Sequence, residues 1–82
     1  MHKGDNMEDW YTRLKKERTE LHKKIERLKT FLYENERGVG KIIIDEYRIY
    51  LLYSQLNAMQ QYLAILDERI ALEGENNNEN DN

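Results

Sequence analysis

The sequence predicts an all-α protein: an antiparallel two-helix coiled-coil hairpin that oligomerises into a helical bundle. Two long segments carry apolar residues at alternating steps of three and four, a glycine-containing break separates them, and no proline occurs in the 82 residues. Two helices of similar length joined by a short turn pack antiparallel along their apolar stripes.

The first predicted helix covers residues 7–34 and follows a flexible N-terminus at residues 1–6. Asp5 or Asn6 is placed to cap it. Arg18 interrupts the apolar row of this helix, where the spacing requires an apolar side chain. Two interpretations of Arg18 stay open. Either it fixes the helix register by pairing with a carboxylate or reaching the edge, or copies of it gather in an oligomer and bind an anion.

The predicted turn covers residues 35–44. Gly38 and Gly40 are expected to supply positive φ angles where the chain reverses. The β-branched run at residues 42–44 is either an extended segment or a cover over the end of the hairpin, because periodicity does not separate the two. Asp45 is the expected N-cap of the second helix.

The second predicted helix covers residues 45–73, and Gly74 is placed to end it. Its first apolar row forms the seam toward the other helix and consists of Ile49, Leu52, Leu56, Met59, Leu63, Leu66 and Ile70. A second apolar row is rotated away from this seam, and one hairpin has no further helix to cover it. We therefore predict an oligomer interface formed by Tyr47, Leu51, Ala58, Tyr62, Ile65 and Leu72. The acidic, asparagine-rich tail at residues 74–82 is predicted to be disordered.

Composition and charge narrow the class of protein. The chain has no cysteine, which excludes disulfides and thiolate metal sites, and no apolar run long enough to cross a membrane. The N-terminus lacks the apolar stretch of a signal peptide, so a cytoplasmic protein is expected, in the host cytoplasm if the gene is a phage gene. Residues 1–41 carry 11 − 8 = +3 charges and residues 42–82 carry 2 − 8 = −6. This asymmetry either favours the antiparallel pairing or leaves an anion-binding face.

Catalysis is not expected, and no cofactor or metal ion is predicted. The chain has two histidines, and no serine or threonine has a base at triad-like placement. His22 lies on the basic helix, where a solvated surface histidine is the expected role. We therefore predict a binding protein and not an enzyme.

The candidate ligand-binding residues combine guanidinium groups with flat aromatic rings. Three tyrosines recur every three residues at the start of the second helix, and an arginine lies between them. Such groups stack on nucleobases or anchor a protein interface, or they simply pack around the end of the hairpin. General DNA or RNA binding is not favoured, because glutamates are interleaved with the lysine pairs of the first helix. The candidates are Arg18, Tyr47, Arg48, Tyr50, Tyr53 and Arg69.

Two sequence stretches carry a resemblance to a known family. They run from Glu8-Asp9-Trp10 to Leu28-Lys29-Thr30-Phe31-Leu32 and from Leu51 to Leu72, and the most distinctive positions are Gln55-Leu56, Met59, Tyr62 and Arg69-Ile70. Over residues 8–72 the chain resembles a family of small helical-hairpin proteins of tailed phages, described as related to a crAss-like phage protein. It departs from that family in the turn, where Gly-Val-Gly-Lys-Ile-Ile-Ile replaces an acidic helix start. The resemblance implies a phage origin and a helical fold, and it carries no catalytic motif.

Three hypotheses about function follow from these features. By analogy of fold and setting, a phage hairpin of this kind is similar to proteins that sequester nucleotide immune signals between subunits, so self-association and an anionic nucleotide ligand are expected. Alternatively, the second apolar row docks a helix of a host or phage protein. The third hypothesis is a structural phage accessory protein with no ligand and no host partner.

Overall fold

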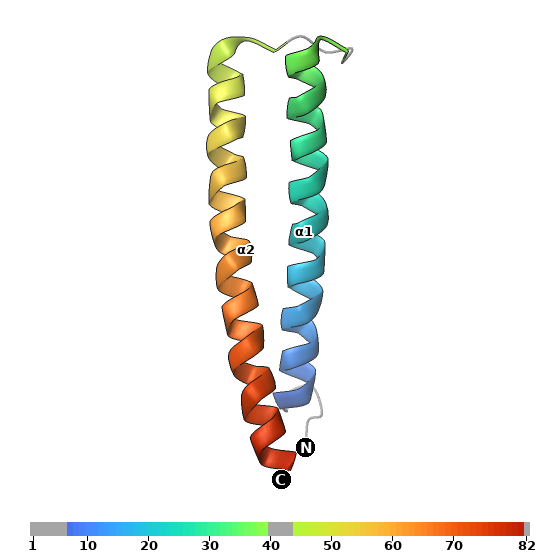
Figure 1. Ribbon diagram of the computed structural model, residues 1–82, viewed down its shortest axis with the longest axis vertical. Coiled ribbons are helices and arrows are strands. Elements are labelled where there is room, and N and C mark those ends of the chain that lie inside the picture. Colours follow the sequence, from blue (N-terminus) through green and yellow to red (C-terminus); the bar gives the residue numbers. More distant parts are fainter. Residues whose placement is uncertain (1–6, 40–43, 82) are drawn as a thin grey trace.

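Two antiparallel helices form a hairpin, which confirms the predicted fold class (Figure 1). The computed structural model describes residues 7–39 and 44–81, with side chains placed for residues 9–39 and 44–74. Helix α1 spans Met7–Arg37 and helix α2 spans Glu46–Asp81. The molecule is a rod with principal dimensions of 55 × 24 × 19 Å. Oligomerisation stays a prediction.

Helix α1 ends three residues later than the sequence pattern predicts, at Arg37. Gly38 follows with a φ of 74°, as predicted. The Gly38 N–H donates to the Asn35 carbonyl at 3.2 Å and the Val39 N–H donates to the Glu34 carbonyl at 3.1 Å. These two bonds form a Schellman motif, which satisfies the last carbonyls of the helix. The apolar row stops at residue 32, but the backbone continues in helical form until the first glycine permits a left-handed residue. The predicted roles of Gly40 and of residues 42–43 lie outside the described residues.

Helix α2 begins directly after Asp45, the predicted N-cap, and the Ile49 N–H donates to the Asp45 carbonyl at 3.0 Å. The predicted stop at Gly74 is not observed, because the helical backbone continues to Asp81. Among the described glycines only Gly38 has a positive φ. Glycine permits a left-handed helix cap without requiring one, and no proline follows Gly74 to block the helix.

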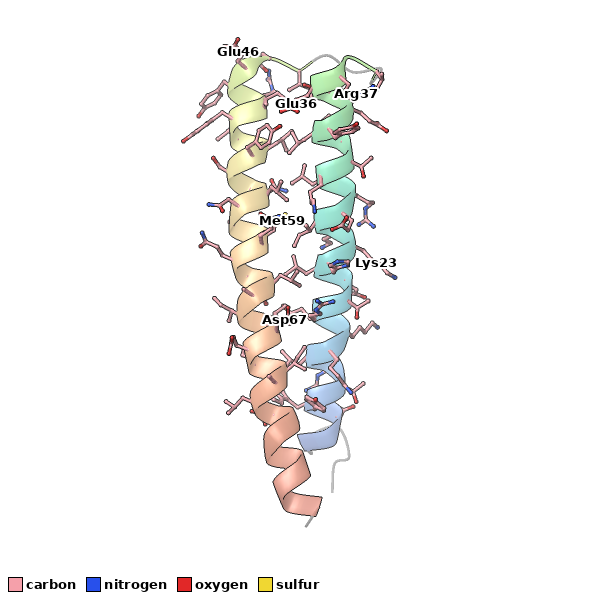
Figure 2. All side chains as sticks on the ribbon, in the orientation of Figure 1. Lys23, Glu36, Arg37, Glu46, Met59 and Asp67 are labelled. Atoms are coloured by element: carbon pink, nitrogen blue, oxygen red, sulfur yellow. The ribbon has the colours of Figure 1, made fainter. Side chains whose placement is uncertain are left out.

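A narrow core lies along the seam between the helices. Its fully buried side chains are Leu14, Ile25, Leu32 and Leu66, each at most 4% exposed. The other residues of the first apolar row of α2 are half-buried. Figure 2 shows Met59 of this row on the side of α2 that faces α1, whereas Lys23 lies on the outer side of α1. No polar side chain of the described residues is buried. The seam predicted from the spacing is therefore the core of the hairpin.

The second apolar row of α2 remains exposed in the single chain. Leu51 is 45% exposed, Ile65 is 55% exposed and Leu72 is 56% exposed, and Tyr47 and Ala58 are also exposed. One apolar row of α2 thus packs against α1, and the second row has no cover within the hairpin. This exposed row is called the outer row below, and it consists of Tyr47, Leu51, Ala58, Ile65 and Leu72.

Candidate functional site

The first turn of α2 carries two stacked tyrosines and an arginine, called the tyrosine–arginine cluster below; Arg48 is turned about 100° from Tyr47 and about 160° from Tyr50 around the helix. Tyr47 and Tyr50 are both more than 60% exposed, and their rings stack with centroids 6.3 Å apart and an interplanar angle of 26°. Arg48 lies between them in sequence, with its side chain 76% exposed. The cluster offers flat ring surfaces and a guanidinium that forks phosphate well.

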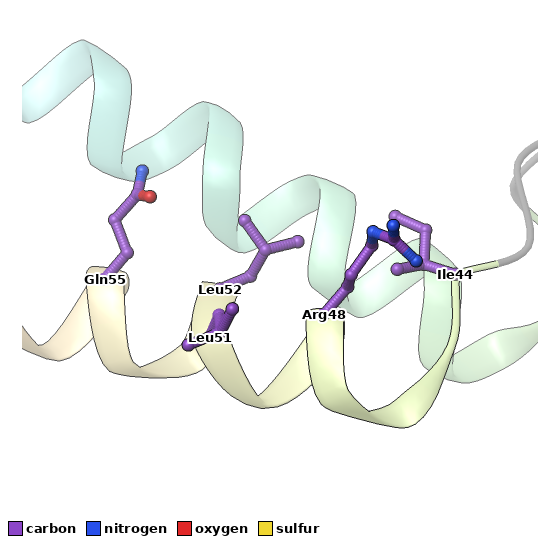
Figure 3. Close-up of a pocket in the computed structure, with 5 residues that line it drawn as sticks. All are labelled: Ile44, Arg48, Leu51, Leu52 and Gln55. Carbon is purple, nitrogen blue, oxygen red and sulfur yellow. The ribbon is translucent and has the colours of Figure 1, made fainter.

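Beside this cluster lies a shallow groove with a volume of about 240 Å³ (Figure 3). Its walls are mainly apolar, and one guanidinium and one amide provide the polar groups. Pockets that hold drug-sized ligands usually measure about 300–1,000 Å³. The groove of one chain is smaller than that range, so it holds part of such a ligand. It is lined by Ile44, Arg48, Leu51, Leu52 and Gln55.

Arg48 is held in place by the residue that caps its helix. Its guanidinium donates to the Asp45 carboxylate, with Nη1 and Oδ1 2.8 Å apart. This hydrogen bond lowers the pKa of Asp45, and backbone N–H groups at residues 45 and 48 add to the effect. The carboxylate therefore stays ionised near neutral pH, and it positions Arg48 while neutralising part of its charge.

Tyr53 lies one turn further along α2 and contacts α1 instead of facing the cluster. Its hydroxyl donates to the Glu36 carboxylate at 2.6 Å, which raises the pKa of Tyr53. Glu36 is near the turn end of α1 in Figure 2. The structure therefore gives Tyr53 a role in joining the helices.

The other two candidate arginines contact partners toward the opposite end of the hairpin. The Nε atom of Arg18 donates to Oδ1 of Asp67 at 2.7 Å, and this bond raises the pKa of Arg18. The Arg69 guanidinium lies over the Trp10 ring, 5.7 Å from its centroid. Both contacts join α1 to α2. The Arg18–Asp67 pair supports the interpretation that Arg18 sets the helix register.

One chain does not bring the six candidate residues into a single site. Arg48 and Arg69 are 69 − 48 = 21 residues apart on α2, which is about 32 Å at 1.5 Å per residue. Tyr47, Arg48 and Tyr50 form one group at the turn end. Arg69 lies beside Trp10 near the N-terminus of α1, and Arg18 lies 18 − 10 = 8 residues further along α1, beside Asp67. A ligand that contacts both Arg48 and Arg69 needs a second chain.

Sequence reasoning did not identify the partners across the hairpin. Besides Asp67 and Glu36, it missed the bond from the Tyr62 hydroxyl to the Glu17 carboxylate, which raises the pKa of Tyr62. Aligning the two helices antiparallel through their apolar rows would have placed these residues at neighbouring edges of the seam. The groove residues Ile44, Leu52 and Gln55 were also missed as a group, because one lies in the turn and two lie on the helix.

Metal binding and membrane insertion are not indicated by the part of the chain that the structure describes. No group of three or more histidine or acidic side chains is placed to hold a metal ion there. Neither described helix has a stretch apolar enough to span a membrane.

Comparison with known proteins identifies one family. Residues 8–72 match the family model described as Sequestin. No curated protein and no solved structure matches the chain. The matched range runs from the first turn of α1 to the last residue of the outer row, so it includes all six candidate residues.

Proposed function

This chain belongs to the Sequestin family, and on that premise we propose that it is a non-enzymatic phage protein that sequesters a nucleotide immune signal between subunits. Family membership suggests a sequestering function. The ligand class is our inference from the tyrosine–arginine cluster, since stacked rings accept a nucleobase and a guanidinium accepts a phosphate. Counter-defence of a phage against its host is the setting that this inference implies.

The observation that carries the proposal is the incomplete groove beside the cluster. Tyr47, Arg48 and Tyr50 offer base-stacking and anion-binding groups, but the adjoining groove of about 240 Å³ is too small for a whole dinucleotide. The outer row, which continues from the same surface along α2, is exposed in the single chain. A second subunit on that row would enlarge the groove. Of the six candidate residues, Tyr47, Arg48, Tyr50 and Arg69 have exposed groups available for this role, and Arg18 and Tyr53 are proposed at its margin.

The proposal is tested by isothermal titration calorimetry and a thermal-shift screen with cyclic dinucleotides, cyclic trinucleotides and cyclic ADP-ribose variants. We expect at least one compound to bind at micromolar concentration or below and to raise the unfolding temperature. Arg48→Gln should weaken that binding at least tenfold. Arg27→Gln is the matched control, because Arg27 is an exposed arginine on α1 outside the candidate site. If no compound in the panel binds, the proposed ligand class is wrong.

A second candidate function is a protein-binding adaptor, which the exposed outer row favours. Leu51, Ile65 and Leu72 lie seven residues apart or a multiple of seven, which is the spacing of a helix-docking surface. If a helix of a host or phage protein docks on this row, the chain would inhibit or recruit that protein. Recovery of one stoichiometric partner from host lysate, lost in Ile65→Lys, would favour the adaptor over the ligand-sequestering function.

A further inference from the structure

The exposed apolar surface of this molecule lies almost entirely on α2. Among the described residues, the large exposed apolar side chains of α2 are Tyr47, Tyr50, Leu51, Tyr53, Tyr62, Ile65 and Leu72, whereas α1 has only Tyr33. A second copy that covers the outer row with apolar atoms therefore has one surface to offer, which is its own outer row. Contacts of this kind, with the same surface on both copies, follow two-fold symmetry.

The outer row is self-complementary about Ala58. Leu51 precedes Ala58 by seven residues and Ile65 follows it by seven. If two α2 helices pack antiparallel with Ala58 at the two-fold axis, Leu51 of each copy lies level with Ile65 of the other. Alanine at the axis allows the helices to approach closely, and the larger side chains pack on both sides of it.

The residues beside the outer row match in the same register. The edge next to the groove carries Arg48, Gln55, Tyr62 and Arg69 at heptad spacing. Arg48 lies 58 − 48 = 10 residues before Ala58 and Arg69 lies 69 − 58 = 11 after it, so Arg48 of one copy is within about 1.5 Å of the level of Arg69 of the other, on the same edge. Gln55 and Tyr62 match in the same way. Tyr47, which forms the opposite edge of the outer row itself, lies within about 1.5 Å of the level of Glu68 of the other copy. This contact would repeat the tyrosine–carboxylate bonds that join α1 and α2 within the hairpin. Ile44, at the end of the groove, lies level with Leu72.

We propose that α2 packs antiparallel on α2 of a second copy about a two-fold axis at Ala58, and that Arg69 and Leu72 of that copy complete the groove. Two arginines that lie about 32 Å apart in one chain then face each other across each groove. Two adjacent guanidinium groups attract an anion between them, although Asp45 offsets part of the charge of Arg48, so each dimer offers two sites for a phosphate or diphosphate group. The pairing of the helices stands by itself, whereas the arginine site rests on the proposed function and assigns its phosphate-binding residues.

Cysteine cross-linking tests the pairing without any ligand, because the chain has no cysteine of its own. Under mild oxidation Ala58→Cys should form a covalent dimer with itself, and Leu51→Cys should cross-link to Ile65→Cys when the two variants are mixed. Asn57→Cys is the matched control, since this exposed neighbour is turned about 100° away on the helix. Cross-linking of Leu51→Cys to itself, or of Asn57→Cys as readily as Ala58→Cys, overturns the antiparallel pairing.

Mixing two arginine variants tests the shared site, with inorganic pyrophosphate as the probe in calorimetry. Arg48→Gln and Arg69→Gln should each lose at least tenfold in affinity. An equimolar mixture should regain about a quarter of the wild-type sites, because half of the dimers are mixed and one of their two grooves is intact. No recovery in the mixture, or no binding of pyrophosphate by the wild type, overturns the arginine site. Neither result affects the cross-linking outcome or the nucleotide screen, which test the pairing and the proposed function separately.

Discussion

At residue 18 an arginine occupies a seam position between Leu14 and Leu21, and the structure shows how the hairpin accommodates it. The guanidinium is directed to the edge of the seam and bonds Asp67, so no unpaired charge is buried. An exposed ion pair of this kind adds little stability, but it matches one level of α1 to one level of α2. A coiled coil with a uniform apolar seam lacks such a marker and can slip by a heptad.

Arg18→Leu should therefore raise stability and lower register specificity. A leucine at this position completes the apolar row and packs against Leu14 and Leu21, and only an exposed ion pair is lost. Urea unfolding monitored by circular dichroism should show a higher midpoint. Asp67→Asn serves as the control, because it removes the ion pair without adding apolar area and should not raise the midpoint. A lower midpoint for Arg18→Leu would show that the pair contributes more than its exposure implies.

Because of the tyrosine–carboxylate bonds at residues 53 and 62, the stability of the fold should vary with pH in the alkaline range. Each hydroxyl donates to a glutamate, and the pKa of each tyrosine is raised above its ordinary value near 10. A group with a raised folded-state pKa stabilises the fold fully below its unfolded pKa, and this contribution is lost as pH rises through the folded value. Stability should therefore decrease from about pH 10 upward. Thermal unfolding between pH 8 and 11 should show a smaller decrease for the double variant Tyr53→Phe, Tyr62→Phe than for the wild type. Tyr33→Phe, whose ring contacts Arg37, is the control and should follow the wild type.

At the scale of the elements, the course of the two helices was largely predictable and their contacts were not. The alternating steps of three and four located the seam and Asp45 located the start of α2, whereas α1 continues three residues past its predicted end, to the residue before Gly38. Helix-terminus signals are permissive, which is why Gly74 did not stop α2. The partners Asp67 and Glu36 depend on how the two helices are aligned, and periodicity within one helix does not specify that alignment.

The candidate site was predictable by residue type and less so by arrangement. Tyr47 and Tyr50 do stack on each other, because residues three apart share one face of a helix, whereas Arg48 lies on another side of the helix and lines the groove. Arg69 lies far from them in the same chain. Its place in a shared site depends on a second molecule, which one sequence does not describe.

Gly74 inside α2 offers a direct test of helix packing near the N-terminus of α1. A Cβ atom built on Gly74 meets the Tyr11 hydroxyl at 3.1 Å, so Tyr11 must move slightly if the glycine is replaced. Alanine is favoured over glycine in a helix by about 1 kcal/mol. We expect Gly74→Ala to gain less than this amount in the wild type and to approach it when Tyr11→Phe removes the hydroxyl. Urea unfolding of the two single variants and the double variant measures this coupling. If Gly74→Ala raises the free energy of unfolding equally with and without Tyr11→Phe, the contact with the hydroxyl has no energetic effect.

For the whole molecule, the outer row determines whether the hairpin acts alone. Pairing two copies covers Leu51, Ile65 and Leu72 of each, and these side chains are about half exposed in the single chain. Full burial of one large apolar side chain contributes roughly 1.5–3 kcal/mol. Because the six side chains are already about half buried, pairing contributes half of this for each, about 5–9 kcal/mol in total. Association costs at least about 4 kcal/mol of lost translational and rotational freedom, and micromolar affinity corresponds to about 8 kcal/mol net. The difference is about 1–5 kcal/mol, which corresponds to a dissociation constant of about 0.2 mM or weaker. The outer row alone therefore supports a weak dimer, and an anion between Arg48 and Arg69 would strengthen it.

This balance makes thermal stability depend on protein concentration. If only the folded hairpin pairs, mass action raises the unfolding temperature as concentration increases, most strongly above the dissociation constant. Differential scanning calorimetry from about 0.05 to 5 mM should show a rising unfolding temperature for the wild type, and light scattering should show a growing dimer fraction. Ile65→Lys should remove the dependence while keeping the fold, because Ile65 is 55% exposed in the hairpin and supports no core contact. Tyr33→Lys introduces the same charge at an equally exposed apolar site on α1, and this variant should retain the concentration dependence. An unfolding temperature that does not change with concentration in the wild type would mean that the hairpin remains a monomer and that another partner covers the outer row.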